Sequence, residues 1–182
     1  MEIHPTLYVP DRAGWRAWLA ANHATAQAIW LLSYGRGDER PSVPYLAAVE
    51  EALCFGWIDG IAKRLDAERL AQRFTPRRPK SHWTELNKDR ARRLIAAGLM
   101  TDAGRAVLPD LSIESFRIAD DILAALQADA QAWENFQQFP AHYQRIRIGY
   151  IEEMRRQPQE FARRLQSFLG KTRRGVMFGT LE

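Results

Sequence analysis

Residues 56–87 read GWIDGIAKRLDAERLAQRFTPRRPKSHWTELN, and this stretch decides the fold that the sequence predicts. Two short segments of extended character, residues 57–64 and 69–74, flank the turn-forming residues 66–68, as in a β-hairpin. Gly56 is placed to end the helix expected before the hairpin, because glycine commonly terminates helices. The sequence therefore predicts a hairpin that pairs with an earlier strand.

The residues before the hairpin predict a helix, a strand, a loop and a second helix. Asp11 is placed to cap the first helix, which carries tryptophans on one stripe. Residues 28–34 form an apolar run bounded by glycine, which is typical of a buried strand. Residues 35–44 collect Gly, Asp, Pro and Ser and predict a loop. Ser42 is then expected to cap a helix that extends to Phe55.

The residues after the hairpin predict a stiff connector followed by a helix. Pro76 and Pro79 hold the arginines between them on an extended segment, because proline interrupts both sheet ladders and helices. Ser81 is expected to cap the next helix, and Trp83 to lie on its core face. Gly98 has the position of a helix C-cap.

The second half of the chain reads as helical. Residues 117–170 carry apolar side chains at helical spacing, and residues 109–116 combine Pro, Asp and Ser without a period, as a linker does. We therefore predict an α+β protein with a small mixed domain over residues 1–108 and a helical C-terminal segment. Residues 171–182 are expected to form a loose basic tail.

The composition indicates a cytoplasmic protein. At 182 residues and 46% hydrophobic content, the chain can bury a core as one domain with a helical extension. No apolar run approaches the 18 or so residues of a membrane span, and the N-terminus lacks the pattern of a signal peptide. The single Cys54 excludes an internal disulfide, and its apolar neighbours predict a buried, inert thiol.

The positive charge is concentrated around the hairpin and its connector. The net charge is +4, but residues 60–93 hold eleven Lys or Arg against four acids, a net of +7, so the remainder carries −3. A second basic cluster spans residues 163–174. Such patches attract phosphates, carboxylates, nucleic acid or acidic surfaces. Arginine abundance is also what a GC-rich genome produces, so it defines no partner by itself.

Several motifs relate the chain to a known family: residues 50–60 (EEALCFGWIDG), residues 73–79 (RFTPRRP), Ser81, Trp83, Asn87, residues 98–100 and Gly104. In these motifs the chain resembles the bacteriocin-protection, YdeI/OmpD-associated family of small bacterial proteins. The resemblance is strong over residues 11–105 and looser beyond. It implies a role in stress or in resistance to bacteriocins and antimicrobial peptides, and association with a membrane protein, the porin OmpD. It implies no reaction and no catalytic residue.

The residues themselves predict a pocket for an anionic small molecule. Arginine guanidinium groups form paired hydrogen bonds with carboxylates and phosphates, and tryptophan rings stack on flat ligands. The predicted ligand-binding residues are Trp57, Arg73, Arg77, Arg78, Ser81, Trp83 and Asn87. The alternative is that one arginine pairs with Asp59, the others are solvated and both tryptophans lie in the core.

Asp59 is the candidate catalytic residue. As a general base it would make the protein an enzyme, and Glu50 or Glu51, turned toward solvent or toward the site, could complete a carboxylate pair. Pairing of Asp59 with an arginine is the alternative. The histidines have no metal-ligand spacing, and no nucleophile or phosphate-loop motif occurs, so neither a metal nor a cofactor is expected. His82 is the histidine to test.

Nucleic-acid binding is the alternative from another functional class. Lys88, Arg90, Arg92 and Arg93 follow one another on the predicted helix and could contact phosphates. Glu85 and Asp89 interrupt this basic face, and a solvated surface explains the helix nearly as well. The sequence leaves enzyme activity and oligomeric state open.

Overall fold

The computed structural model describes residues 2–35 and 38–179, and two residues of the predicted loop 35–44 lie outside that part. The chain forms two compact units. Unit 1 is Met1–Ser81 with Ala91–Pro109, and unit 2 is His82–Arg90 with Asp110–Glu182. The α+β class is confirmed, because unit 1 contains a mixed sheet and the C-terminal region is helical.

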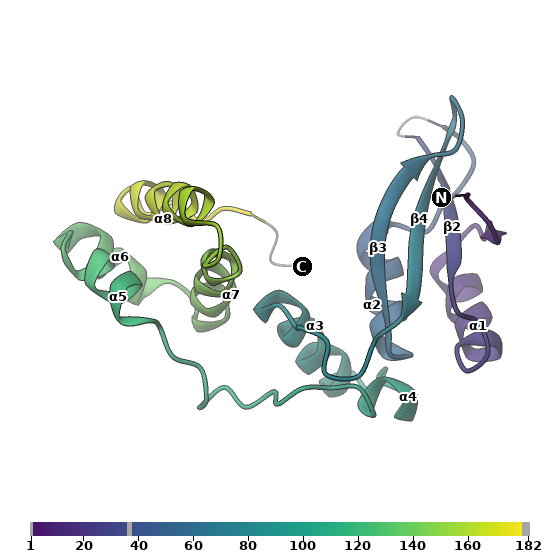
Figure 1. The fold of residues 1–182 in the computed structure, drawn as a ribbon, viewed down its shortest axis with the longest axis horizontal. Helices are drawn as coiled ribbons and strands as arrows, with labels where there is room; N and C mark the ends of the chain where they lie inside the picture. Colours follow the sequence, from purple (N-terminus) through teal and green to yellow (C-terminus); the bar gives the residue numbers. More distant parts are fainter. Residues whose placement is uncertain (1, 36–37, 180–182) are drawn as a thin grey trace. The chain divides into compact units, whose positions relative to one another are not determined.

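Unit 1 is built on a sheet in which the strands follow the order β1-β2-β4-β3 (Figure 1). Its elements are β1 (Thr6–Leu7), α1 (Arg12–Asn22), β2 (Ile29–Tyr34), α2 (Tyr45–Cys54), β3 (Trp57–Arg64), β4 (Arg69–Pro76) and α4 (Asp102–Arg105). Strand β4 pairs antiparallel with both β2 and β3, and β1 pairs parallel with β2. The predicted hairpin and its pairing with the earlier strand are therefore confirmed, whereas β1 was not predicted.

Aromatic side chains fix α1 and α2 against the sheet. Trp15 and Trp18 stack at 5.4 Å between ring centroids, and Trp15 lies 5.1 Å from Phe74 of β4. The Trp15 indole donates to the carbonyl oxygen of Ala48 in α2, at 3.0 Å. Asp11 accepts the amide N–H of Gly14 at 2.8 Å, which confirms the predicted N-cap. The tryptophan stripe of α1 is thus the core of unit 1.

Both predicted serine caps are wrong. Helix α2 begins at Tyr45 after Pro44, and the Ser42 hydroxyl instead accepts the amide N–H of Tyr34 at 3.0 Å. Helix α3 (Glu85–Ala96) is capped by Thr84, which accepts the Asn87 N–H at 3.1 Å. Ser81 and Trp83 therefore precede this helix. The Ser42 hydroxyl is used by an amide at the end of β2, and Thr84 takes the capping position that Ser81 was expected to hold.

The C-terminal end of α2 packs against the segment that follows α3. Gly98 ends α3 with φ of +69°, as predicted, and Thr101 caps the short helix α4 by accepting the Gly104 N–H. Thr101 also donates to the carbonyl oxygen of Cys54 twice, from its hydroxyl at 2.5 Å and from its amide at 3.1 Å. These bonds satisfy a carbonyl group that the end of α2 would otherwise leave without a partner.

Unit 2 is a helical cluster with its own core. Its helices after the linker are α5 (Asp120–Gln127), α6 (Ala130–Gln138), α7 (Ala141–Glu152) and α8 (Pro158–Arg173). They enclose Ile122, Leu126, Phe136, Tyr143, Ile148, Ile151 and Phe168. The first half of α3 belongs to this unit. The prediction of a helical C-terminal segment is confirmed.

The end of the chain is more ordered than the sequence predicted. Helix α8 continues to Arg173, beyond the predicted start of the loose tail at residue 171. Phe178 then packs on the core of unit 2, and its amide donates to the Tyr143 hydroxyl at 3.2 Å. Residues 180–182 of the predicted tail lie outside the described part of the chain.

Candidate functional site

A cavity of about 260 Å³ lies in unit 1 between the sheet and the start of α2. It is lined by Leu31, Ser33, Val43, Tyr45, Ala48, Ala62, Leu70, Ala71 and Gln72. The register of β2 and β4 pairs Leu31 with Gln72 and Ser33 with Leu70. Because side chains alternate between the two faces of a sheet, these four lie on one face. The walls are mostly apolar.

The cavity opens toward solvent between α2 and the hairpin. Tyr45 is 54% exposed and Leu70 is 40% exposed, although both carry large apolar groups. Ala62 of β3, also exposed, has a side chain too small to close the opening. Exposed apolar side chains that border a cavity are typical of binding sites.

Two polar side chains at this site have defined partners. The Tyr45 hydroxyl donates to Oδ2 of Asp59 at 2.7 Å. The Gln72 amide nitrogen donates to the carbonyl oxygens of Gly60, at 2.8 Å, and Arg73, at 3.4 Å. Asp59 and Gly60 belong to β3, beside an irregularity in its pairing with β4. These bonds hold Tyr45 and Gln72 in fixed orientations.

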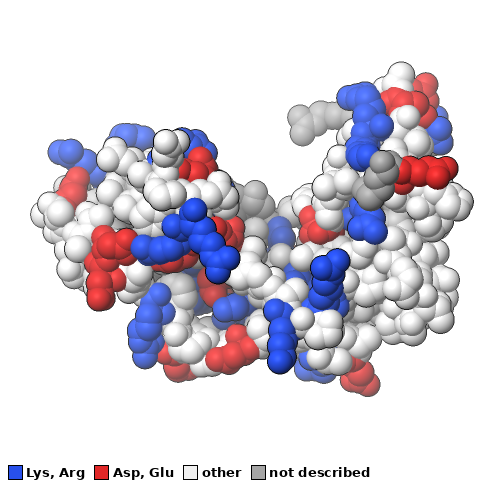
Figure 2. Space-filling view, in the orientation of Figure 1, with Lys and Arg blue, Asp and Glu red and all other residues white. Residues whose placement is uncertain are grey.

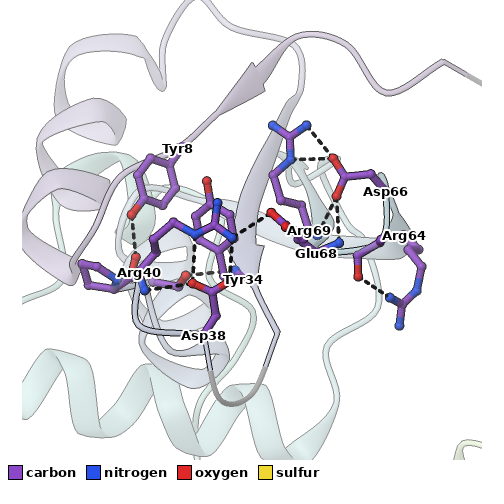
Figure 3. A network of polar contacts seen from close by, with 11 residues as sticks. Tyr8, Tyr34, Asp38, Arg40, Arg64, Asp66, Glu68 and Arg69 are labelled. Carbon is purple, nitrogen blue, oxygen red and sulfur yellow. Dashed lines mark hydrogen bonds and ion pairs between the residues drawn. The ribbon is translucent and has the colours of Figure 1, made fainter.

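A polar network fastens the segment before α2 to the turn of the hairpin (Figure 3). Arg40 lies 3.7 Å above the Tyr34 ring and forms ion pairs with Asp38, at 2.6 Å, and Glu68, at 2.8 Å. The Tyr8 hydroxyl donates to the carbonyl oxygen of Pro41. The residues of this network lie next in the chain to three residues that line the cavity, namely Ser33, Val43 and Leu70. The network therefore holds one end of the cavity in place.

We expect Arg40→Ala to raise the pKa of Asp38. Hydrogen bonds from Arg40 hold the pKa of that carboxyl at about 2, against about 3.9 for a free aspartate. A lowered pKa means that Asp38 contributes stability above pH 4, and that this contribution is lost as the pH falls toward 2. Carboxyl carbon NMR titration measures the shift directly.

Arg69→Ala is the matched control for this titration. The pKa of Asp66 is also about 2, because Arg69 donates to its carboxylate. The Arg69→Ala change should therefore raise the pKa of Asp66 and leave that of Asp38 in place. If the Asp38 carboxyl titrates at the same pH with and without Arg40, Arg40 does not hold Asp38 in the network.

The two tryptophans of the predicted pocket have different surroundings. Trp57 is 1% exposed, donates from its indole to the His23 carbonyl oxygen at 3.2 Å and meets the Trp18 ring edge-on at 5.8 Å. It is a core residue of unit 1. Trp83, 6% exposed, lines a separate cavity of about 250 Å³ in unit 2, together with His82, Thr84, Glu85, Lys88, Phe116, Gly149, Glu152 and Glu153.

The predicted arginines do not line the cavity of unit 1. Arg73 pairs with Trp30 in the register and so points to the other face of the sheet from Gln72. Arg77 is buried, and burial lowers the pKa of its guanidinium to about 10 although the charge of Asp59 opposes the change. Arg78 is exposed. Asp59 therefore has both a tyrosine donor and an arginine charge nearby.

Ser81 and Asn87 also have local roles. Ser81 is half-buried, and its amide donates to the Arg78 carbonyl oxygen at 3.1 Å. Asn87 accepts from Arg90 at 3.0 Å. Asp59 is close enough to Arg77 for its charge to raise the pKa of that arginine. None of the eight predicted site residues lines the cavity of unit 1. Tyr45, Gln72 and Ser33, which line it, were not predicted.

Of the two glutamates expected to include one facing solvent or the site, Glu51 is not that residue, because it is buried and does not line the cavity. It is 2% exposed and accepts from Arg12 and Arg16 of α1. Burial raises the pKa of the neighbouring Cys54 thiol to about 11, and the Glu51 charge adds to this effect. Cys54 is thus a buried thiol held in its protonated form.

Metal binding has no candidate in the described residues. Within residues 2–35 and 38–179, His, Cys, Asp and Glu side chains form no group of three that could hold a metal ion. In the same residues, no helix is both long enough and apolar enough to cross a membrane.

The fold defines an α+β protein with a cavity of about 260 Å³ in its mixed unit. Residues 7–107, more than half of the chain, match the family described as "Domain of unknown function (DUF8412)", and the chain belongs to that family. Residues 115–175 match the family described as "Bacteriocin-protection, YdeI or OmpD-Associated". No curated protein and no solved structure matches the chain.

The match confirms the predicted relationship but corrects its location. The resemblance was expected to be strongest over residues 11–105, whereas the YdeI or OmpD-associated family matches the C-terminal helices and a different family matches the first unit. The motifs around the hairpin therefore belong to the family of unknown function. Each family match falls mainly on one structural unit.

Proposed function

We propose that this protein binds a small molecule in the cavity of unit 1, as part of the resistance role that its second family description suggests. The observation that carries the proposal is the cavity itself, with apolar walls, a partly open mouth and two oriented polar side chains. Its 260 Å³ is just below the roughly 300–1,000 Å³ typical of ligand pockets.

The walls favour a ligand with an apolar body. The lining residues include no Lys or Arg, so this cavity differs from the predicted anionic pocket. Anion binding by Arg73, Arg77 and Arg78 stays a prediction, as does the cytoplasmic location. The size suits a single ring with one substituent, because a cavity of roughly 150 Å³ can hold benzene.

Catalysis by Asp59 is the second candidate function. Its carboxylate accepts a hydrogen bond from Tyr45, whose phenol lines the cavity, and such a pair can exchange a proton with a bound molecule. The test is turnover that the Asp59→Asn variant loses although it unfolds at the same temperature as the wild type. That result would establish that the protein is an enzyme and that Asp59 takes part in catalysis.

Nucleic-acid binding receives less support. On the face shown in Figure 2, lysines and arginines lie beside aspartates and glutamates, so positive and negative groups are interspersed. Arg69, Arg155 and Arg163 each form an ion pair with an acid close to them in sequence. Phosphate binding requires cations free to replace counterions, and these pairs reduce their number.

We expect Ala62→Phe to abolish ligand binding. The new ring would occupy the mouth of the cavity, and because Ala62 is exposed the fold should tolerate it. Binding is measured with a panel of single-ring fragments by amide NMR shifts at Leu31, Val43 and Ala48. At least one fragment should shift these signals in the wild type, and none should do so in the variant.

Ala67→Phe is the matched control, because Ala67 is an exposed alanine in the turn of the same hairpin and does not line the cavity. Its fragment binding should equal that of the wild type. The proposal fails if no fragment shifts the lining residues of the wild type, or if Ala62→Phe and Ala67→Phe bind alike.

A further inference from the structure

We propose that unit 2 contains a second ligand site, which binds a free α-amino acid with an apolar side chain. The site lies where the first turn of α3 meets the end of α7, and it consists of two adjoining cavities. It shares no lining residue with the cavity of unit 1, so this inference is independent of the function proposed for that cavity.

The two cavities of this site differ in size and border each other. The smaller one, about 250 Å³, is the cavity that Trp83 lines, and the larger one measures about 610 Å³. Four residues line both cavities: His82, Thr84, Glu152 and Glu153. Arg155 and Arg156 complete the larger cavity, and all of these residues belong to unit 2. The larger volume lies within the roughly 300–1,000 Å³ typical of ligand pockets.

Close packing of α7 against the start of α3 holds the wall of the smaller cavity in place. A Cβ atom added at Gly149 would lie 2.8 Å from Cγ of Glu85, so a glycine is needed where the two helices touch. Thr84 caps α3 by accepting the amide N–H of Asn87, and it lines both cavities. Trp83 directly precedes this cap, so the start of the helix sets its backbone position. This part of the site is therefore formed without a ligand.

The smaller cavity offers apolar and aromatic surface. Trp83 and Phe116 line it and do not line the larger cavity. Trp83 is 6% exposed, and Phe116 packs on the core of unit 2. An apolar group placed here is favoured, because its contact with the two rings removes apolar surface from water. A cavity of roughly 150 Å³ can hold benzene, so this one can accommodate the side chain of phenylalanine or leucine.

Most of the charges around the two cavities are paired within the protein. Lys88 donates to the Glu85 carboxylate at 2.7 Å. Arg155 forms ion pairs with Glu152 and, at 2.7 Å, with Asp121. Because each of these charges already has an opposite partner, a ligand would have to compete for it. They therefore contribute little to the choice of ligand.

Glu153 and Arg156 are the remaining carboxylate and guanidinium of the lining. Both side chains are exposed, and in the described part of the chain neither forms a salt bridge. Although Glu153 is partly exposed, burial of its carboxyl group raises the pKa, and the charges of His82 and Arg164 oppose this change. A carboxylate that has lost part of its hydration gains from an ammonium donor.

The end of α7 adds to the attraction for an ammonium group. Glu153 follows the last residue of α7 as its C-cap, and the C-terminus of a helix carries partial negative charge, which attracts cations. Arg156 offers a guanidinium group, which binds carboxylates through paired hydrogen bonds. The site thus presents one negative and one positive group, and these complement the ammonium and the carboxylate of an amino acid.

The distribution of these groups matches the connectivity of an amino acid. Glu153 lines both cavities, whereas Arg156 lines the larger one and Trp83 the smaller one. In an α-amino acid the ammonium, the carboxylate and the side chain leave the same carbon atom. An ammonium group beside Glu153 therefore leaves the side chain for the smaller cavity and the carboxylate for the larger one. An amine or an acid of the same shape satisfies only one of the two charges.

Four ligands test this assignment: L-phenylalanine, phenethylamine without the carboxylate, phenylpropionate without the ammonium group, and glycine without the ring. Their affinities for the full-length protein are measured by NMR titration of the amide signals of Phe116 and Gly149. We expect L-phenylalanine to bind at least about tenfold more tightly than each of the other three, because each of them lacks one of the three interactions.

Variants then identify the two charged groups. Glu153→Gln should lower the affinity for L-phenylalanine to that of phenylpropionate, and Arg156→Gln should lower it to that of phenethylamine. Both residues are exposed, so the unfolding temperature should stay that of the wild type. Glu134→Gln and Arg174→Gln are the matched controls, because they remove the same charges from exposed positions of unit 2 that line neither cavity.

The outcomes also separate this site from the cavity of unit 1. If L-phenylalanine shifts the signals of Leu31 and Ala48 but not those of Phe116 and Gly149, unit 2 has no such site and the inference is wrong. If phenethylamine or phenylpropionate binds to unit 2 as tightly as L-phenylalanine, the site does not select an amino acid. Equal affinities in Glu153→Gln and its control would likewise overturn the assignment.

Discussion

Gly104→Ala is expected to destabilise unit 1 by about 3 kcal/mol, the upper end of the usual range for overpacking, because the new methyl group overlaps a backbone carbonyl group that is fixed in place. A Cβ at Gly104 would lie 2.3 Å from the carbonyl oxygen of Cys54 and 2.5 Å from the sulfur of Met100. The Cys54 carbonyl is already fixed by two donors from Thr101. Relief of the clash therefore requires α4 to leave the end of α2.

Thermal unfolding measures this effect, with Gly98→Ala as the matched control. Gly98 has φ of +69°, and a methyl group added there would meet no atom within 4 Å, so its replacement costs about 1 kcal/mol of backbone strain. For a chain of this size, the difference between the two variants corresponds to roughly 4–8 °C in Tm. Equal Tm values for Gly104→Ala and Gly98→Ala would show that α4 is not packed tightly on α2.

The fold of unit 1 is predictable from sequence where local and tertiary signals agree. The hairpin has alternating segments around a turn, and its partner strand is an apolar run bounded by glycine, so pattern and pairing lead to the same answer. Asp11 is similar, because it precedes the first apolar residue of α1 and no other side chain nearby competes as a cap.

The serine caps fail where the partner of a side chain comes from elsewhere in the fold. The Ser42 hydroxyl is used by the amide of Tyr34, at the end of the strand before it, and Pro44 leads into α2 instead. Sequence spacing cannot distinguish a hydroxyl that caps a helix from one that holds the neck of a loop. At Ser81, the competing cap Thr84 lies three residues further on.

The cavity could not be predicted, because β2, the start of α2, β3 and β4 all contribute to it and none of them carries a binding motif. Two of its lining residues, Ala48 in α2 and Ala62 in β3, have side chains too small to fill it. The core position of Trp57, in contrast, has a signal in the sequence. Helix α1 carries two tryptophans on its apolar stripe, and Trp57 at the start of β3 is readily buried against them. That signal favours a core role over ligand stacking.

We expect Glu51→Gln to destabilise unit 1 by about 3 kcal/mol, the lower end of the range for breaking a buried ion pair. The Glu51 side chain is 3% exposed and accepts from Arg12, at 2.5 Å, and Arg16, at 2.6 Å. Burial alone would lower the pKa of both arginines, but the hydrogen bonds and charge of Glu51 raise it instead. Glu51 thus joins α2 to α1.

The loss stays at the lower end because the two arginines are not themselves buried. The Arg12 and Arg16 side chains are 40% and 34% exposed, so water can solvate their charges once the Glu51 carboxylate is gone.

Glu50→Gln is the matched control. The Glu50 side chain is 17% exposed, and its ion pairs with Arg12 and Arg93 measure 3.0 and 3.7 Å. Longer and more hydrated pairs of this kind contribute about 1 kcal/mol or less. Chemical denaturation of the two variants should therefore show a midpoint for Glu51→Gln clearly below that for Glu50→Gln, and the reverse order would mean that the exposed rim of the cluster, not its buried centre, holds α1 against α2.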